Sequence, residues 1–436
     1  MIVEAFKNLK GKRLLLLGSS VWKDLIKAFA DEYGVVLIFA GSMPSCVEEI
    51  ADETYRIDST NRELMIPFIK KHNIDGVYMG GSEWIISHAC DYINELGLPC
   101  YCEKEQWDVL QNKSNFKDLC AKFDLPVVPK FQIDPDNIEG SIEKKEFPVI
   151  TKPVDGSGSR GFTICHNSDE LKRGYEFASS CSPTGSVICE KFVKNAAVVA
   201  FYSILGDEIV FCGIEDKIPV KYDEHGTYVA GFFHFPSALE YEFRCRFESG
   251  IHKMLKYLNL HGGSIWMEIF HDGDTYYFNE AGYRHGGSFS FYPLNYLYGI
   301  NQFYYDLYYA LTGEGKLLGF PSLISGSVKR CENYCVYPIH CNAGKIAVET
   351  GVEEIIEKYP KNIVVIPHKY NIGDVIADSG SFAQVYSLFH FVCDSVEECR
   401  EIVDFIQKTY KVRDPDGNNI VRVMLRPEDI CGVSTR

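Results

Sequence analysis

The sequence predicts an α/β and α+β protein, and three observations support this class. The chain has 436 residues, and a domain takes about 150 residues, so about three domains are expected. The N-terminal part alternates short apolar runs with helical patterns, which is the order of a parallel sheet. The central part alternates strand patterns with glycine-rich loops, and the C-terminal part combines short strand-like runs with one amphipathic helix over 396–411. We expect domains over residues 1–108, 109–320 and 321–436.

The N-terminal segment has the element order of a Rossmann-like domain. Its first strand ends in Gly18-Ser19-Ser20, which lacks the Gly-x-Gly-x-x-Gly pattern of dinucleotide sites. We therefore expect a structural domain that binds no NAD. Apolar runs that end at turn residues predict strands, and apolar residues at helical spacing predict helices. The expected strands cover 13–17, 35–39, 76–79 and 99–102, and the expected helices cover 22–33, 61–72 and 84–96.

The composition is that of a folded protein with an excess of acidic residues. There are 44 Lys and Arg against 60 Asp and Glu, a formal charge of −16, and 46% hydrophobic residues. Nucleic-acid partners are not expected, because they require a clustered basic face. A membrane partner is not expected either, because no apolar stretch reaches the roughly 18 to 20 residues that span a bilayer. Residues 1–10 show no signal-peptide pattern, so we expect a cytoplasmic protein.

The 16 cysteines are scattered through apolar runs such as Val187-Ile188-Cys189. This distribution predicts buried, reduced thiols instead of disulfides. No Cys-x-x-Cys pair occurs, and the spacing of Cys331, Cys335 and Cys341 only approaches that of a zinc site.

A glycine-rich loop follows a short strand in the segment 147–161. The strand presents Lys152, and the loop offers backbone N–H groups and hydroxyls that can surround phosphate oxygens. The lysine precedes the glycines, so this is not a Walker A loop. The alternative is a hairpin tip without a ligand. The loop residues concerned are Gly156, Ser157, Gly158, Ser159 and Gly161.

A hairpin with one glutamate on each strand is predicted over 263–287, with its turn at Asp272-Gly273-Asp274. A three-residue loop pairs Glu268 with Phe278 and makes Glu268 and Glu280 diagonal neighbours on one face, about 7 to 8 Å apart. A two-residue turn would put them on opposite faces. Because unpaired carboxylates on apolar strands are costly, we expect them to converge on Mg²⁺. The alternative is a pair of surface glutamates on an edge hairpin.

Taken together, these stretches resemble the ATP-grasp superfamily, in particular its L-amino acid ligase-like and biotin carboxylase-like members. The resemblance implies a Rossmann-like pre-ATP-grasp domain, a two-lobed ATP-grasp domain with a small lid lobe at about 125–190, and a small C-terminal α+β domain. It also implies ATP and Mg²⁺ as cofactors, with Mn²⁺ as an alternative ion, and Glu268 and Glu280 as metal ligands. The implied ATP-binding residues are Lys113, Lys152, the loop residues above, and the hinge Glu190, Lys191, Phe192 and Val193.

The sequence departs from the family pattern at several positions. Gly282 stands where a metal-binding asparagine is common, and Trp266 stands where the ligases often have histidine. Asn195 and Ala197 replace the usual glycine and glutamate near the ribose, so Lys191 or another residue would have to substitute.

The resemblance implies that Arg284, with Lys152, is catalytic, because its planar fork suits a carboxylate or an acyl phosphate. Lys217 is either a phosphate or acyl contact or a solvated lysine, and His234 either lines the substrate pocket or packs in the core. The implied substrate-binding residues are Lys217, His234, Trp266, Arg284, Gly286 and Gly287.

The function that this resemblance implies is an ATP-dependent carboxylate-amine ligase that works through an acyl phosphate and releases ADP and phosphate. Its partners would be a small-molecule acid and amine, and the sequence gives no indication of an oligomeric state. Two alternatives are a bicarbonate-activating enzyme of the carboxylase or carbamoyl-phosphate type, and an ATP-binding regulatory protein without turnover.

Overall fold

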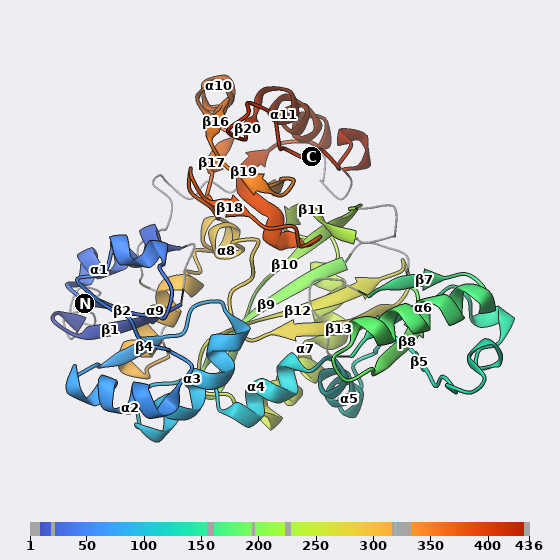
Figure 1. Cartoon of the computed structure of the whole chain (residues 1–436), viewed down its shortest axis with the longest axis horizontal. Coiled ribbons are helices and arrows are strands. Elements are labelled where there is room, and N and C mark those ends of the chain that lie inside the picture. The colour runs from blue at the N-terminus through green and yellow to red at the C-terminus, as the bar shows by residue number, and fades with distance from the viewer. Residues whose placement is uncertain are drawn as a thin grey trace.

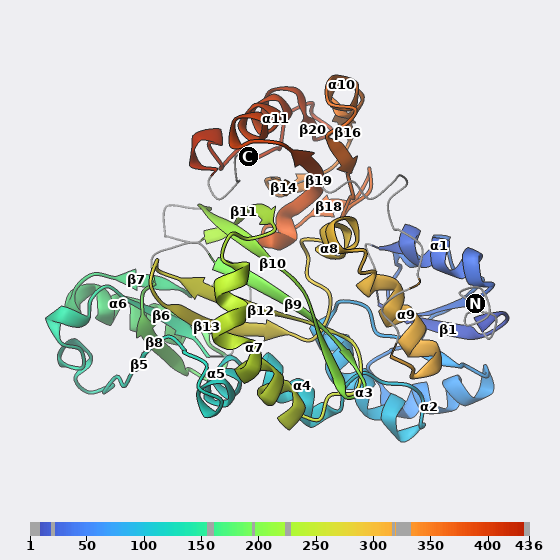
Figure 2. The same ribbon diagram turned by 180° about the vertical axis from the view of Figure 1, so that it is seen from behind.

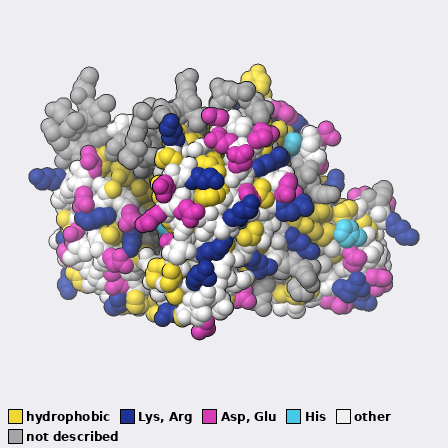
Figure 3. Space-filling model, turned by 90° about the horizontal axis from the view of Figure 1, so that it is seen from above, with side chains coloured by type: hydrophobic (Ala, Val, Ile, Leu, Met, Phe, Trp, Pro, Cys, Tyr) yellow, Lys and Arg dark blue, Asp and Glu magenta, His cyan; other side chains and the backbone are white. Residues whose placement is uncertain are grey.

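A computed structural model describes residues 9–18, 22–154, 161–193, 197–222, 228–315, 319 and 333–430. Figure 1 shows the N-terminal sheet at one end, a small lobe at the other, and a large sheet between them, with the C-terminal part above. No helix in the described ranges is long and apolar enough to span a membrane. On the upper face, basic and acidic side chains are intermixed (Figure 3).

The N-terminal sheet is parallel, as predicted, with strand order β3-β2-β1-β4. The expected strand at 99–102 was wrong. Residue Asn94 donates its side-chain amide to the Cys102 carbonyl at 2.9 Å, which occupies a backbone group that a sheet would pair. The elements are β1 (Arg13–Leu17), α1 (Lys23–Tyr33), β2 (Val36–Ala40), β3 (Glu53–Tyr55), α2 (Arg62–Lys71), β4 (Gly76–Tyr78) and α3 (Glu83–Glu95).

Two helices, α4 (Lys104–Gln111) and α5 (Lys113–Lys122), lead into the small lobe. Asn112 caps α5, because its side-chain oxygen accepts the N–H groups of Ser114 and Asn115 at 3.0 Å. The lobe is an antiparallel sheet of order β5-β8-β6-β7 with α6 packed on it. These elements are β5 (Lys130–Phe131), β6 (Val149–Pro153), β7 (Thr163–Cys165), α6 (Ser168–Cys181) and β8 (Val187–Lys191).

The large sheet has eight strands in the order β13-β12-β9-β10-β11-β14-β19-β17. Alternate residues of β9 enter different cores: Tyr202 packs on the side of α7, and Phe201 on the side of α8 and α9. Figure 2 shows α7 lying across the first of these faces. The elements are β9 (Ala197–Leu205), β10 (Glu208–Lys221), β11 (Tyr228–Phe235), α7 (Glu240–Tyr257), β12 (Ser264–His271), β13 (Tyr276–Gly282), α8 (Phe291–Tyr298) and α9 (Gln302–Thr312).

The C-terminal part shares this large sheet, because β14 pairs with β11 and β19 pairs with β14. The α+β character and the helix near 396–411 were predicted, but the shared sheet was not. The division at residues 108 and 320 stays a prediction. The elements are β14 (Asn333–His340), β15 (Gly344–Lys345), β16 (Val348–Thr350), α10 (Val352–Lys358), β17 (Ile363–Val365), β18 (Val375–Ile376), β19 (Val385–Cys393), α11 (Val396–Thr409) and β20 (Lys411–Arg413). Short 3₁₀ turns cover Cys46–Glu49, Ile138–Gly140, Lys144–Glu146, Phe382–Gln384 and Pro427–Asp429.

Candidate active site

The hairpin β12–β13 brings its two glutamates together, although not in the predicted register. Glu268 lies directly opposite Glu280. The turn is tighter than expected, because the Asp272 N–H donates to the Thr275 carbonyl at 3.2 Å and only two residues lie between them. His271 accordingly pairs with Tyr276. A tight turn alone would have put the carboxylates on opposite faces. A bulge at Asn279 adds one residue to β13 and returns them to the same face. The predicted three-residue loop was therefore wrong, whereas the shared face was correct.

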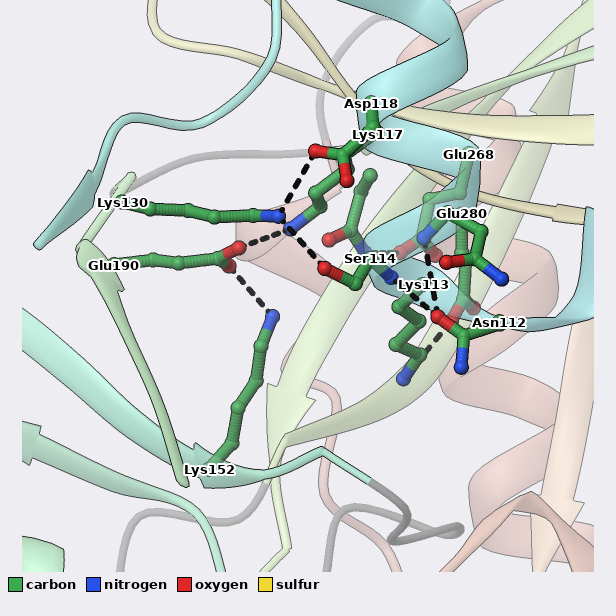
Figure 4. Close-up of polar contacts among 12 residues, drawn as sticks. Asn112, Lys113, Ser114, Lys117, Asp118, Lys130, Lys152, Glu190, Glu268 and Glu280 are labelled. Carbon is green, nitrogen blue, oxygen red and sulfur yellow. Dashed lines mark hydrogen bonds and ion pairs between the residues drawn. The ribbon is translucent and has the colours of Figure 1, made fainter. Parts of the chain in front are cut away.

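Each hairpin carboxylate is paired with a lysine from another segment. Lys217 on β10 bonds to Glu268. Lys113 at the start of α5 lies 3.1 Å from Glu280 (Figure 4). We call Glu268, Glu280, Lys113 and Lys217 the hairpin cluster. Asn279 also belongs here, because its amide donates to Glu268 Oε1 at 2.9 Å.

A second ionic group lies where α5 meets the small lobe, and we call it the Glu190 cluster. Lys117 Nζ lies 2.5 Å from one oxygen of Glu190, and Lys152 Nζ lies 2.7 Å from the other. The two lysines approach Glu190 from different directions in Figure 4. Lys117 stands one helical turn after Lys113, so one face of α5 carries both.

Charge balance fixes the protonation of these groups. Glu280 draws the pKa of Lys113 above its ordinary value. Burial opposes the charge on Glu280, but Lys113 and Lys217 hold its pKa below the usual range. Burial, with Lys152 close by, lowers the pKa of Lys117 to about 8. Glu190 is ionised despite its burial, because Lys152 and Lys117 hold its pKa low.

The glycine loop predicted to bind phosphate lies largely outside the described residues, namely at Gly156, Ser157, Gly158 and Ser159. Gly161 is described, and it has a φ of +81°. A Cβ there would lie 2.7 Å from Pro153 and Cys181, so position 161 requires glycine.

The predicted adenine hinge covers the last two residues of β8 and the two residues after it. The N–H groups of Lys191 and Phe192 are already bonded to the carbonyls of Pro129 and Pro148, both at 3.0 Å. Glu190, expected to hold the base, instead bonds two lysines through its carboxylate. An adenine would therefore have to use other backbone groups near Val193.

Arg284 follows the hairpin and lies over the Trp266 ring, with its guanidinium carbon 5.6 Å from the ring centre. Its Nη2 donates to Glu83 Oε1 at 2.6 Å, so the start of α3 reaches this end of the site. Trp266, Arg284 and Gly286 line the same small hollow. A Cβ on Gly282 would lie 2.2 Å from the indole of Trp266. The tryptophan therefore fills the space that the usual asparagine at Gly282 would need.

Lys369 was not predicted, and it reaches this end of the site from the C-terminal part. A Cβ on Gly287 would lie 3.7 Å from Lys369 Nζ, and this nitrogen donates to the Phe382 carbonyl at 3.1 Å. Burial, and to a lesser degree Arg284, lowers the pKa of Lys369 to about 8. Its segment is distant in sequence from the hairpin, so no local signal could have found it.

His234 lies apart from these groups. It pairs with Asp216, whereas the neighbouring pair Lys217–Phe233 faces the carboxylates, so His234 points to the other side of the sheet. Its ring nitrogens lie 2.9 Å from Asn333 Oδ1 and 3.5 Å from Asp216 Oδ2. The structure therefore supports core packing for His234, and the expected substrate contact was wrong.

Glu215 is a further carboxyl on the hairpin side, and the sequence did not single it out. It and Glu268 are both paired with Val199, so the three side chains form one row across the strands. Glu215 is buried, and its Oε2 has no hydrogen-bond partner among the described residues. Burial raises its pKa well above the ordinary value.

One segment of the chain matches a family model of an ATP-binding domain. Residues 112–225 match the family model "Carbamoyl-phosphate synthase L chain, ATP binding domain". The carbamoyl phosphate synthase large chain of Methanospirillum hungatei JF-1 is 27% identical over 206 residues, which are 43% of this chain and 19% of that protein. The chain thus spans about a fifth of the length of this relative.

Two solved structures cover almost the whole chain. The L-amino acid ligase of Bacillus licheniformis has a TM-score of 0.71 at 19% identity, over 93% of this chain and 99% of that one. The second is the biotin carboxylase domain of Hydrogenobacter thermophilus 2-oxoglutarate carboxylase, in complex with MgADP and bicarbonate. It has a TM-score of 0.71 at 17% identity, over 94% of this chain and 91% of that one. The chain therefore has the fold of these two structures. The resemblance predicted from the sequence is confirmed, and the proteins named are enzymes.

Proposed function

We propose that this protein is an ATP-dependent ligase that joins a small-molecule carboxylic acid to an amine through an acyl phosphate. The observation that carries the proposal is the meeting of four lysines and three carboxylates from separate segments on one side of the large sheet. A cytoplasmic location is part of the proposal. It is supported by the cysteines that the structure describes, which are all free thiols.

The hairpin cluster is chemically suited to Mg²⁺, with Mn²⁺ as an alternative. Glu268 and Glu280 offer oxygen ligands on neighbouring strands. Asn279 adds a buried amide oxygen that has no hydrogen-bond partner among the described residues. Asn279 would thus supply the amide oxygen that an asparagine at position 282 supplies in the family that the sequence resembles. The ion would neutralise charge on the phosphate oxygens of bound ATP.

The lysines would exchange their present partners for phosphate. Lys113 and Lys217 now balance the hairpin carboxylates, and both side chains are about a third exposed, at 35% and 29%. A cation bound by the carboxylates would release these ammonium groups toward the anion. Lys152 is held in position by Glu190, and the glycine loop that follows it would close over the phosphates.

Arg284 and Lys369 would bind the acid. An oxygen of its carboxylate attacks the γ-phosphorus, the bond to ADP breaks, and an acyl phosphate forms. The amine then attacks the acyl carbon, inorganic phosphate leaves, and the amine nitrogen loses a proton. Arg284 would replace its contact to Glu83 with the substrate carboxylate and stabilise the oxyanion of the second step. Trp266, Gly286 and Gly287 would shape the acyl end, and Lys217, which now bonds Glu268, would contact either the acyl group or a phosphate.

A coupled ADP-release screen tests the proposal, with amino acids and other carboxylic acids supplied singly and in pairs with amines in the presence of Mg-ATP. We expect ADP release to require both an acid and an amine, with an amide as the product. Release that depends on bicarbonate would instead favour the carboxylase or carbamoyl-phosphate alternative. ATP binding without turnover across the whole panel would favour a regulatory protein.

A further inference from the structure

Three cysteine sulfurs meet on the opposite face of the large sheet. Cys335 lies on β14, Cys393 ends β19, and Cys399 lies in the first turns of α11. Cys335 Sγ is 3.7 Å from Cys393 Sγ and 3.8 Å from Cys399 Sγ. The three sulfurs lie within 4.8 Å of one another, and at most 2% of each residue is exposed.

The register of the sheet and the stripe of the helix produce this meeting. Cys335 pairs with Phe391, so Cys393, two residues further along β19, is its diagonal neighbour on the same face. Cys399 belongs to the buried stripe of α11, together with Ile402, Val403 and Ile406. Figure 2 shows α11 beside β14 and β19. Three elements therefore each direct one thiol to the same point.

The spacing matches that of a thiolate-bound metal. A metal–sulfur distance of about 2.3 Å with tetrahedral angles separates two sulfurs by about 3.75 Å, and trigonal angles separate them by about 4 Å. The two separations of 3.7 and 3.8 Å from Cys335 lie close to the first value. The hydrogen bonds that Cys399 and Cys335 make through sulfur are to other members of the cluster.

The surroundings also suit bound thiolates. The cluster lies at the start of α11, where the helix dipole favours negative charge. The nearby Glu398 carboxylate is directed elsewhere, because it accepts the Asn362 amide and the Asp394 N–H. His234, paired with Cys335 across the strands, has its ring nitrogens engaged by Asn333 and Asp216. Within the part of the chain that the structure describes, the donors are three sulfurs.

We propose that Cys335, Cys393 and Cys399 bind one thiophilic metal ion, Zn²⁺ or Cu⁺. Soft thiolates select these ions and discriminate against Mg²⁺, which belongs with the oxygen ligands of the hairpin. Three donors suit trigonal Cu⁺ directly, whereas Zn²⁺ takes a fourth ligand. The ion would tie α11 to β14 and β19. It has no role in the ligase reaction, so this proposal stands independently of the proposed function.

The test begins with the reduced full-length protein. It is titrated with Cd²⁺ as a spectroscopic probe of thiolate binding, and then with Zn²⁺ and with Cu⁺, each against a competing chelator. We expect one equivalent per chain, a thiolate-to-metal charge-transfer band, and a rise in melting temperature with the preferred ion. Because these measurements need no variant, a folding defect cannot obscure them. A wild-type protein that gives no charge-transfer band and binds neither ion would overturn the proposal.

Variants then assign the ligands. Cys393→Ala and Cys399→Ala should each weaken binding at least 100-fold, while Cys341→Ala should bind like the wild type. Cys341 is a matched control, because it is buried in the same core but lies outside the cluster. Equal affinity in all three variants would contradict the assignment. So would a disulfide between two of the three cysteines in protein purified without reductant.

Discussion

The Glu190 cluster and the hairpin cluster contain the same residue types but differ in charge balance and access to solvent. In the first, one carboxylate serves two lysines, and Glu190 and Lys117 are at most 2% exposed. In the second, two carboxylates face two lysines, and Glu280 is 27% exposed. A sealed ion pair fixes positions, because breaking it leaves a buried charge. An open pair can exchange its partner. We therefore propose that the Glu190 cluster holds its side chains in position, whereas the lysines and carboxylates of the hairpin cluster exchange each other for bound phosphate and metal ion.

The largest expected effect is on stability. Glu190→Gln leaves two lysines without a carboxylate, one of them fully buried, and should cost about 3 to 5 kcal/mol of unfolding free energy. Chemical denaturation measures this. Glu139→Gln is the matched control, because its contact to Lys172 in the same lobe is exposed and should be worth less than about 1 kcal/mol. Equal losses in the two variants would remove the distinction between the clusters.

In the hairpin cluster the effect should fall on catalysis. Glu280→Gln should lower kcat/KM for Mg-ATP about 100-fold, because the proposed function makes Glu280 a ligand of the metal ion. Stability should change little, since this side chain is partly exposed. Steady-state kinetics and thermal melting of the same preparations separate the two effects. Glu242→Gln on the exposed side of α7 controls for the loss of one negative charge. Unchanged turnover in Glu280→Gln would refute the metal assignment.

The acyl end of the hairpin cluster can be tested by restoring the usual family residue. Gly282→Asn should destabilise the protein by about 1 to 3 kcal/mol, because the new side chain collides with Trp266. Adding Trp266→Ala should recover much of the loss. A double-mutant cycle on denaturation midpoints measures this coupling. Additive effects would mean that Trp266 is not what excludes a side chain at position 282.

The bulge that brings the hairpin carboxylates together can be tested at Asn279. Asn279→Ala should raise the Mg²⁺ concentration needed for half-maximal activity about 10-fold, because an oxygen donor beside Glu268 is removed. Asn279→Asp should lose less, since it keeps an oxygen. Magnesium titrations of ADP release provide the measurement. An unchanged magnesium requirement in Asn279→Ala would exclude this residue as a ligand.

An effect of the same size as that of Asn279→Ala is expected at Lys369, whose pKa of about 8 lies within an accessible range. The lysine is charged below this pKa, so the KM for the acid should rise as pH increases through 8. Lys369→Met should raise KM about 10-fold at pH 7, or about 1.4 kcal/mol, and should flatten this pH dependence. Lys361→Met, on the exposed part of the same segment, is the control. A variant that keeps the wild-type pH profile would exclude Lys369 from the acid site.

Local patterns were enough to predict the site's main landmarks. Alternating elements predicted the parallel sheet. Lys152, Glu268 and Glu280 stood out because a charged residue on an apolar strand is costly unless it has a partner. Lys117 could also have been found, since it follows Lys113 by one helical turn. The bulge at Asn279 could not be predicted, because its position depends on the pairing of β13 with β12 and not on the sequence of β13 alone.

Other errors had the same physical origin. His234 could either pack in the core or contact the substrate, depending on the face of the sheet to which it points. That face is fixed by the pairing of β11 with β10 and β14. Lys369 and Glu215 join the site through contacts between segments distant in sequence. Sequence patterns therefore predicted many of the elements, with the strand at 99–102 as an error, whereas long-range pairing decided which side chains meet.

The shared eight-stranded sheet also bears on how the chain is made. Strand β11 pairs with β14, yet α7, the β12–β13 hairpin, α8 and α9 are all synthesised between them. Until residues 333–340 leave the ribosome, the apolar β11 has an open edge, and such edges recruit other strands. The nascent chain is thus most exposed to aggregation after strands β9 to β13 exist and before its last quarter arrives. Chaperone demand during translation should peak in that interval.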